Sequence, residues 1–218
     1  MIKNSKNFTA RRSLLTGMGV AAAGVVAGAG SANAQDSGFQ PVRHDSDEWM
    51  DELEGHHRVW IDTSYGLGGM EALHYANNIL TANTQVNDGS DDDYALVVCL
   101  RHYATAIGYE DAMWEKYGEY FSGAMGLTDP ATGKAFMVNP ANLPNRMDLD
   151  NGGDTLDKMR GRGVQFALCN AATRWYSGYI AGEIGGNREE IYKEFVDHAI
   201  PASRFIHAGV FGTTRAQE

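Results

Sequence analysis

Two strand-length apolar runs constrain the fold of this chain more than any other feature. Residues 94–100 read Tyr-Ala-Leu-Val-Val-Cys-Leu, and residues 164–169 read Val-Gln-Phe-Ala-Leu-Cys. Runs with so little alternation are typical of strands covered on both faces, as in parallel sheets. Two shorter runs, 57–62 and 203–207, are bounded by Gly, Ser and Thr and also predict strands.

Segments with helical spacing separate these runs. Leu73, Ala76 and Leu80 recur on one face, and a Thr or Asp cap precedes the segment that starts at residue 155. Alternating strands and helices predict an α/β fold with a mostly parallel sheet and helices on both faces. Ligands of such sheets bind beyond the carboxyl ends of the strands. The expected helices span 70–82, 109–117, 155–159, 170–181, 189–199 and 211–218.

Gly, Pro, Asn and Asp interrupt residues 121–154 so often that we expect a long loop inserted in the domain. The 218 residues are enough for one globular domain, which we place at 56–218 after a polar segment at 35–55.

The first 34 residues have the layout of an export signal. Their four basic residues include Arg11-Arg12, no acid occurs among them, and 14–29 is a run of small and apolar residues. Ala32-Asn33-Ala34 suits a signal peptidase, and the Arg pair with a Gly-rich core resembles a twin-arginine signal. We therefore expect a periplasmic protein that begins at Gln35; an uncleaved membrane anchor is the alternative.

The charge of the chain argues against two kinds of partner, nucleic acid and anionic membrane surfaces. The full sequence carries 28 acidic and 18 basic residues, a net charge of −10, and signal removal leaves 14 basic residues and a charge of −14. Nucleic acid and anionic membrane surfaces would repel such a protein. Two cysteines are also too few for a disulfide scaffold or a four-thiolate zinc site.

Cys169 is the first candidate for chemistry. It stands where a strand ends and a helix begins, and the backbone N–H groups and dipole of a helix start favour a thiolate. Cys99 lies inside an apolar strand but precedes Arg101 and His102, whose charge could stabilise a second thiolate. Inert burial and a disulfide between the two cysteines are the alternatives.

Other residues at the same sheet edge are weaker candidates. Gly66, Gly68 and Gly69 follow the first strand in a context suited to holding an anion, but a tight turn that lets helix and strand pack closely is the favoured explanation. Cysteine and histidine side chains gathered there could also bind copper or zinc, although no pair has the spacing of a metal motif.

The segment Arg162-Gly-Val-Gln-Phe-Ala-Leu-Cys-Asn170 resembles the cysteine segment of the DsrE/DsrF-like sulfur-relay family. Residues 201–210 and 215–218 resemble its closing strand and helix, and Ala76-Asn77-Asn78 its first helix. The resemblance implies a flavodoxin-like three-layer fold and a homotrimer or larger oligomer such as a hexamer. It also implies that Cys169 carries sulfane sulfur as a persulfide between a donor and an acceptor thiol, without a cofactor.

We expect Arg101, His102 and the glycines at 66–69 to line the pocket of such a site, with Asn170 and His207 as further binding residues and Cys99 as a second thiol. The competing hypothesis is a non-catalytic ligand-binding or assembly protein on the same fold, or one that binds a metal. Its motivation is the aromatic group before the long loop, namely Trp114, Tyr117, Tyr120 and Phe121.

Overall fold

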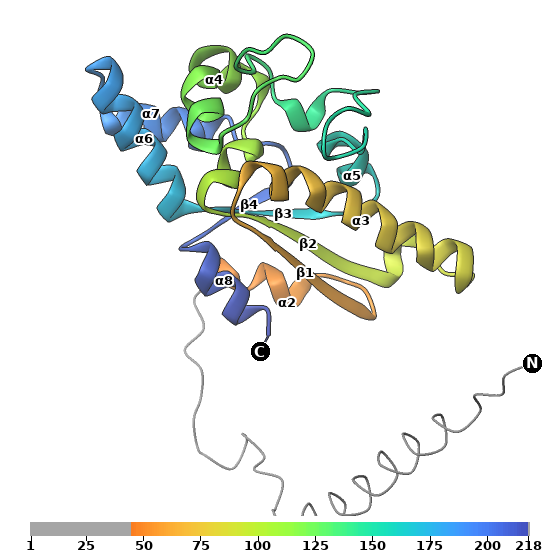
Figure 1. The fold of residues 1–218 in the computed structure, drawn as a ribbon. Helices are drawn as coiled ribbons and strands as arrows, with labels where there is room; N and C mark the ends of the chain where they lie inside the picture. The colour runs from red at the N-terminus through yellow and green to blue at the C-terminus, as the bar shows by residue number, and fades with distance from the viewer. Residues whose placement is uncertain (1–44, 218) are drawn as a thin grey trace, which may run out of the picture. The chain divides into compact units, whose positions relative to one another are not determined.

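The computed structural model describes residues 45–217. The proposed export signal and most of the polar segment that follows it lie outside these residues. Four parallel strands form one sheet in the order β1-β2-β3-β4 (Figure 1). They are β1 (His57–Thr63), β2 (Tyr94–Leu100), β3 (Gln165–Cys169) and β4 (Ser203–Ile206). The α/β class and the parallel sheet expected from the apolar runs are thereby confirmed.

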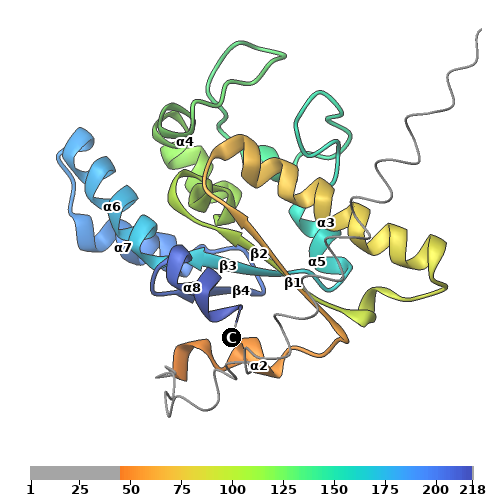
Figure 2. The same cartoon turned by 60° about the horizontal axis from the view of Figure 1, so that its bottom comes forward.

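Helices cover both faces of the sheet. Because the strand order follows the chain and crossover connections are right-handed, the connecting helices lie on one face. They are α3 (Gly66–Val86), α4 (Asp111–Met125), α5 (Leu156–Gly161), α6 (Asn170–Ile184) and α7 (Arg188–Asp197). The terminal helices α2 (Trp49–Glu52) and α8 (Gly209–Arg215) cover the other face, which Figure 2 brings forward.

Alternate side chains of β2 explain its continuous apolar run. Leu96, Val98 and Leu100 belong to the large core beneath the connecting helices. Val97 and Cys99 point the other way, into a smaller core with Met50 of α2 and residues of β3 and β4. The strand therefore has no face that tolerates polar residues, and part of the segment expected to precede the domain belongs to its core.

Two helices, α3 and α4, differ most from their expected bounds. The helix expected at 70–82 begins at Gly66, so Gly66 and Gly69 lie in its first turn rather than in a turn before it. Each packs closely: a Cβ on Gly66 would lie 2.9 Å from Met125 Cβ, and one on Gly69 would lie 2.6 Å from Ile107 Cδ1. Because glycine has no Cβ, the first turn of α3 can pack closely against its neighbours. These tertiary contacts accompany a helix start in a glycine-rich sequence.

Helix α4 continues to Met125, so the first five residues of the expected loop are helical. The aromatic residues before the loop are structural: Trp114, Tyr117 and Phe121 are buried in the large core, and Tyr120 packs against it. The remaining loop contains one short 3-10 helix, η5 (Pro140–Asn142), and is anchored by Asn139, whose amide donates to the carbonyls of Ile107 and Tyr109.

The short 3-10 helices η2 (Asp45–Asp47), η3 (Asp91–Asp93) and η4 (His102–Gly108) complete the fold. None of the helices within residues 45–217 has the length and apolarity needed to cross a bilayer.

Candidate thiol site

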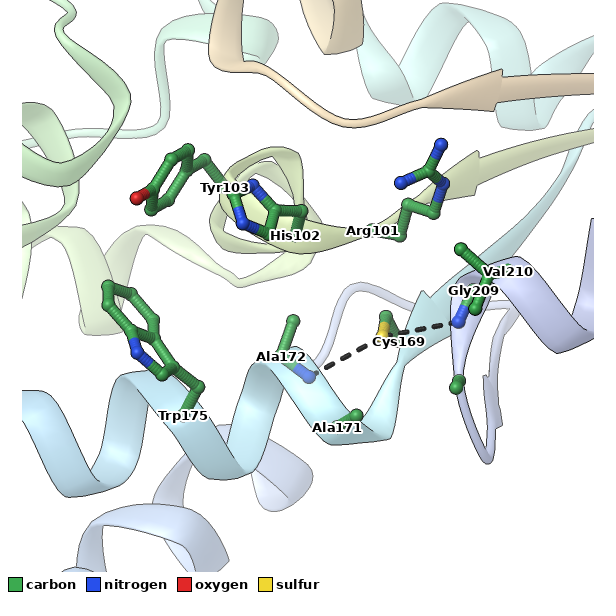
Figure 3. A pocket seen from close by; sticks show the side chains of 10 residues that line it. Arg101, His102, Tyr103, Cys169, Ala171, Ala172, Trp175, Gly209 and Val210 are labelled. Carbon is green, nitrogen blue, oxygen red and sulfur yellow. Dashed lines mark hydrogen bonds between the residues drawn. The ribbon is translucent and has the colours of Figure 1, made fainter.

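Cys169 ends β3 and is the N-cap residue of α6. Its Sγ accepts two backbone hydrogen bonds, from the N–H of Ala172 at 3.4 Å and from the N–H of Gly209 at 3.2 Å (Figure 3). The first donor is in the opening turn of α6 and the second begins α8. Two N–H groups directed at one sulfur stabilise negative charge on it, and the α6 dipole acts in the same sense.

A pocket of about 330 Å³ opens in front of this sulfur. It lies at the carboxyl edge of the sheet, where such folds bind ligands. Most of its wall is apolar. It is lined by Arg101, His102, Tyr103, Cys169, Ala171, Ala172, Trp175, Ala208, Gly209 and Val210 (Figure 3).

Arg101 is the only Lys or Arg that lines the pocket, and it is already paired with Asp62. Its Nε and Nη2 donate to the two carboxylate oxygens of Asp62 at 2.7 and 2.8 Å. The hydrogen bond to Asp62 is the main reason that the pKa of Arg101 is raised, and the charges of Cys99 and Cys169 contribute to it. Arg101 therefore stays charged beside the sulfur while Asp62 neutralises most of its field.

The stem of Arg101 packs directly on the start of α8. A Cβ on Gly209 would lie 2.3 Å from Arg101 Cβ and 2.6 Å from Arg101 Cδ. Only glycine allows α8 to approach this closely, and that approach directs the Gly209 N–H at Cys169.

Aromatic rings form the other end of the pocket. His102 adopts a left-handed backbone conformation with φ of 53°, and its ring lies 4.0 Å from that of Tyr103. The Tyr103 ring meets the Trp175 ring edge-on, with 5.6 Å between the ring centroids. The backbone carbonyl of Tyr103 accepts a hydrogen bond from the Tyr176 hydroxyl at 2.9 Å. Trp175 remains 46% exposed. A strained histidine and an exposed tryptophan are uncommon features that occur together at the mouth of this pocket.

Cys99 has a different environment. Its side chain is fully buried in the smaller core, and it does not line the pocket. Burial, followed by the charges of Asp62 and Cys169, raises the pKa of Cys99 far above its usual range. Both cysteines are free, so the structure does not contain the disulfide considered from the sequence. The expectation of a second reactive thiol at Cys99 conflicts with this burial.

The remaining candidate residues lie outside the pocket wall. Gly66, Gly68 and Gly69 form the first turn of α3 and do not line the cavity. The Asn170 side chain accepts from the Tyr192 hydroxyl at 2.8 Å, which joins α6 to α7. The His207 carbonyl accepts from the N–H of Ala171 at 3.2 Å, so this residue supports the turn beside the site through its backbone. Of the expected residues, Arg101, His102 and Cys169 meet in one place.

The metal hypothesis finds no geometric support within residues 45–217. No three His, Cys, Asp or Glu side chains of this part of the chain are grouped so that they could hold a metal ion.

Sequence reasoning missed the aromatic end of the pocket. Ala172 and Trp175 follow Cys169 by three and six residues, a helical spacing that could have placed them near the sulfur. The juxtaposition of Tyr103 with Trp175 depends on β2 lying next to β3, and no local signal shows which strands are neighbours.

Comparison of the chain with family models, curated proteins and solved structures found no match.

Proposed function

We propose that this protein is a carrier of sulfane sulfur whose nucleophile is Cys169, as the resemblance to DsrE/DsrF-like proteins implies. One observation carries the proposal: the Cys169 sulfur faces a pocket and accepts two backbone N–H groups. Such donors stabilise the negative charge that the sulfur carries when it attacks as a thiolate.

The chemistry requires no cofactor. The Cys169 thiolate attacks the outer sulfur of a persulfide R–S–SH; the donor S–S bond breaks, its electron pair leaves on RS⁻, and Cys169–S–SH forms. An acceptor thiolate then attacks the outer sulfur, and Cys169 leaves as thiolate. Each half-reaction breaks one bond to the transferred sulfur and forms another, so no external oxidant is needed. The pocket of about 330 Å³ leaves room for the added atom.

Loading and discharge of the full mature chain test this proposal. Reduced protein exposed to hydropolysulfide should gain one sulfur, about 32 Da, and lose it to an added thiol. Cys169→Ala should abolish the gain, whereas Cys99→Ala should retain it because the Cys99 thiol is buried. Absence of an adduct on reduced wild-type protein, or an adduct that survives in Cys169→Ala, would contradict the proposal.

A second candidate function is non-catalytic binding of a small ligand in the same pocket. The exposed Trp175 at the pocket mouth favours it. The two functions differ in their dependence on sulfur: Cys169→Ala removes a carrier's activity but leaves a binding protein able to hold its ligand.

Export and assembly belong to the same proposal. We infer that the mature protein begins at Gln35 and works in the periplasm as a homotrimer or hexamer. Intact mass of the secreted protein tests the cleavage site, and replacing Arg11-Arg12 by lysines should retain the precursor in the cytoplasm. Light scattering of the mature protein tests the oligomer, and a monomeric mass would contradict it.

A further inference from the structure

The pocket that contains Cys169 combines an apolar wall with a neutralised cation. Five of its ten lining residues have apolar or aromatic side chains, namely Ala171, Ala172, Trp175, Ala208 and Val210. Binding is favourable when such a wall removes the apolar surface of a ligand from water.

Charge in the pocket is nearly balanced. Arg101 is the only Lys or Arg among the lining residues, and Asp62 occupies the Nε and Nη2 side of its guanidinium. That is one of the sides on which a guanidinium holds a carboxylate with two parallel hydrogen bonds. A ligand carboxylate placed against Arg101 would meet a pair of zero net charge, and the N–H groups of Ala172 and Gly209 already donate to Cys169 Sγ, so the carboxylate would lose its hydration for little return.

The shape of the site favours a small molecule over the tip of a protein. Cys169 is only 6% exposed, and the pocket volume of about 330 Å³ is at the lower end of the range for small-ligand sites. Trp175 and Tyr103 meet edge-on and both line the pocket, so a molecule that enters it meets two aromatic side chains.

We propose that the pocket selects a small thiol or persulfide whose organic group is uncharged and apolar or aromatic, and that the Asp62–Arg101 pair discriminates against carboxylate-bearing analogues. This inference rests on the proposed function for the identity of the transferred group, while the binding selectivity itself requires no sulfur transfer. Asp62 is a specificity-determining residue, and Trp175 supplies the apolar contact.

Equilibrium binding of two unreactive thioethers tests the inference. Benzyl methyl sulfide is neutral, and 4-(methylthiomethyl)benzoate has the same shape with one carboxylate added. Calorimetric titration of the full mature chain should show that the neutral probe binds at least about tenfold more tightly, because the carboxylate is desolvated without a free partner. Equal or tighter binding of the carboxylate, or no binding of either probe, would overturn the inference.

Two variants and one control variant show whether the named residues cause the selectivity. Trp175→Ala should weaken the neutral probe by about tenfold, whereas Tyr75→Ala, which removes an exposed aromatic side chain of α3 outside the pocket, should not. Asp62→Asn should raise the affinity for the carboxylate probe by freeing Arg101. Unchanged selectivity in a folded Asp62→Asn protein would refute the role of the pair.

The test remains separate from the sulfur chemistry. Selective binding by a protein that never gains sulfur would disprove the carrier and leave the pocket assignment intact. Sulfur loading of Cys169 without binding of either thioether, but with discharge to a cysteine-containing peptide, would assign the pocket to a protein acceptor and overturn the inference.

Discussion

Cys99 and Cys169 lie on neighbouring strands, yet their sulfur atoms differ in what surrounds them. Cys99 is enclosed by apolar side chains of the smaller core. Cys169 follows Ala167 on the same face of β3 but stands at the strand end, where two N–H groups and a pocket replace that packing. Position along the strand therefore separates a thiol enclosed in the core from one that lines a pocket.

Because the pKa of Cys99 is raised, the stability of the folded protein depends on pH in the alkaline range. The folded state holds the neutral thiol, whereas the unfolded chain ionises above about pH 8.5. The contribution of Cys99 is therefore fully present below that pH and is lost as pH rises toward its folded pKa. We expect the free energy of unfolding to fall by about 1.4 kcal/mol per pH unit from this group above pH 8.5.

Urea denaturation at pH 8, 9 and 10 measures this slope. Cys99→Ala should be less stable at neutral pH, since it leaves a cavity, but should show a shallower alkaline decline. An identical slope in wild-type and variant would contradict the account of Cys99.

Gly209 determines whether the second N–H reaches the sulfur. Alanine at this position would place its Cβ against the stem of Arg101, which must move together with the start of α8. We expect Gly209→Ala to cost about 1–3 kcal/mol of stability and to slow alkylation of Cys169 by iodoacetamide at fixed pH. A Cβ on Gly182 of α6 would meet no atom within 4 Å, so Gly182→Ala is the matched control. Equal alkylation rates in the two variants would show that the Gly209 N–H does not activate the thiol.

At the scale of elements, one arginine links parts of the chain that are distant in sequence. Arg162, the residue after α5, donates to both carboxylate oxygens of Asp91 at 2.8 and 2.7 Å. Its Nη1 also donates to the Asn77 side chain at 2.7 Å and to Thr81 Oγ1 at 2.9 Å on α3. The hydrogen bond with Asp91 raises the pKa of Arg162, so the charge persists across the accessible pH range.

Removing this link should loosen the helical layer without changing the thiol site. We expect Arg162→Met to lower the free energy of unfolding by about 2 kcal/mol, because charged hydrogen bonds are lost from a largely buried group. Lys193→Met removes an exposed ion pair with Asp197 on α7 and should change stability by no more than about 0.5 kcal/mol. Urea midpoints of the two variants give the comparison, and equal losses would contradict it.

The elements also show where sequence reasoning succeeds. β2 and β3 were predictable because burial on both faces leaves a continuous apolar run. The end of α4 was not, because Gly118 and Gly123 look like loop residues although Gly118 lies against the backbone of Phe136. Likewise, Gly66 begins a helix only because of what packs on it. Glycines of this kind allow close tertiary packing, which the local sequence pattern does not show.

At the scale of the whole molecule, the pocket arises from strand order. Arg101 and His102 follow β2, Cys169 ends β3, and Ala208-Gly209 follow β4, so a sequential parallel sheet brings them to one edge. The sequence predicted that edge and its cysteine. It did not predict that Tyr103 meets Trp175, or that Asp62 forms an ion pair with Arg101. Both contacts depend on side chains that meet across neighbouring strands.

The long loop does not take part in this arrangement. None of the ten residues that line the pocket comes from 126–154. Arg146 pairs with Asp129 at 2.6 Å and with Asp148 at 2.7 Å, and Phe136 and Leu149 are buried, so the loop is a packed part of the domain. The loop is therefore part of the packed domain and not of the wall of the Cys169 pocket.

Peptide mapping by mass spectrometry tests whether Cys169 is the residue that carries sulfur, because it compares both cysteines in one sample. Native protein is reduced, exposed to hydropolysulfide, alkylated and digested. The account predicts one added sulfur on the Cys169 peptide and none on the Cys99 peptide. An unmodified Cys169 peptide, or equal modification of the two cysteines in the folded protein, would contradict it.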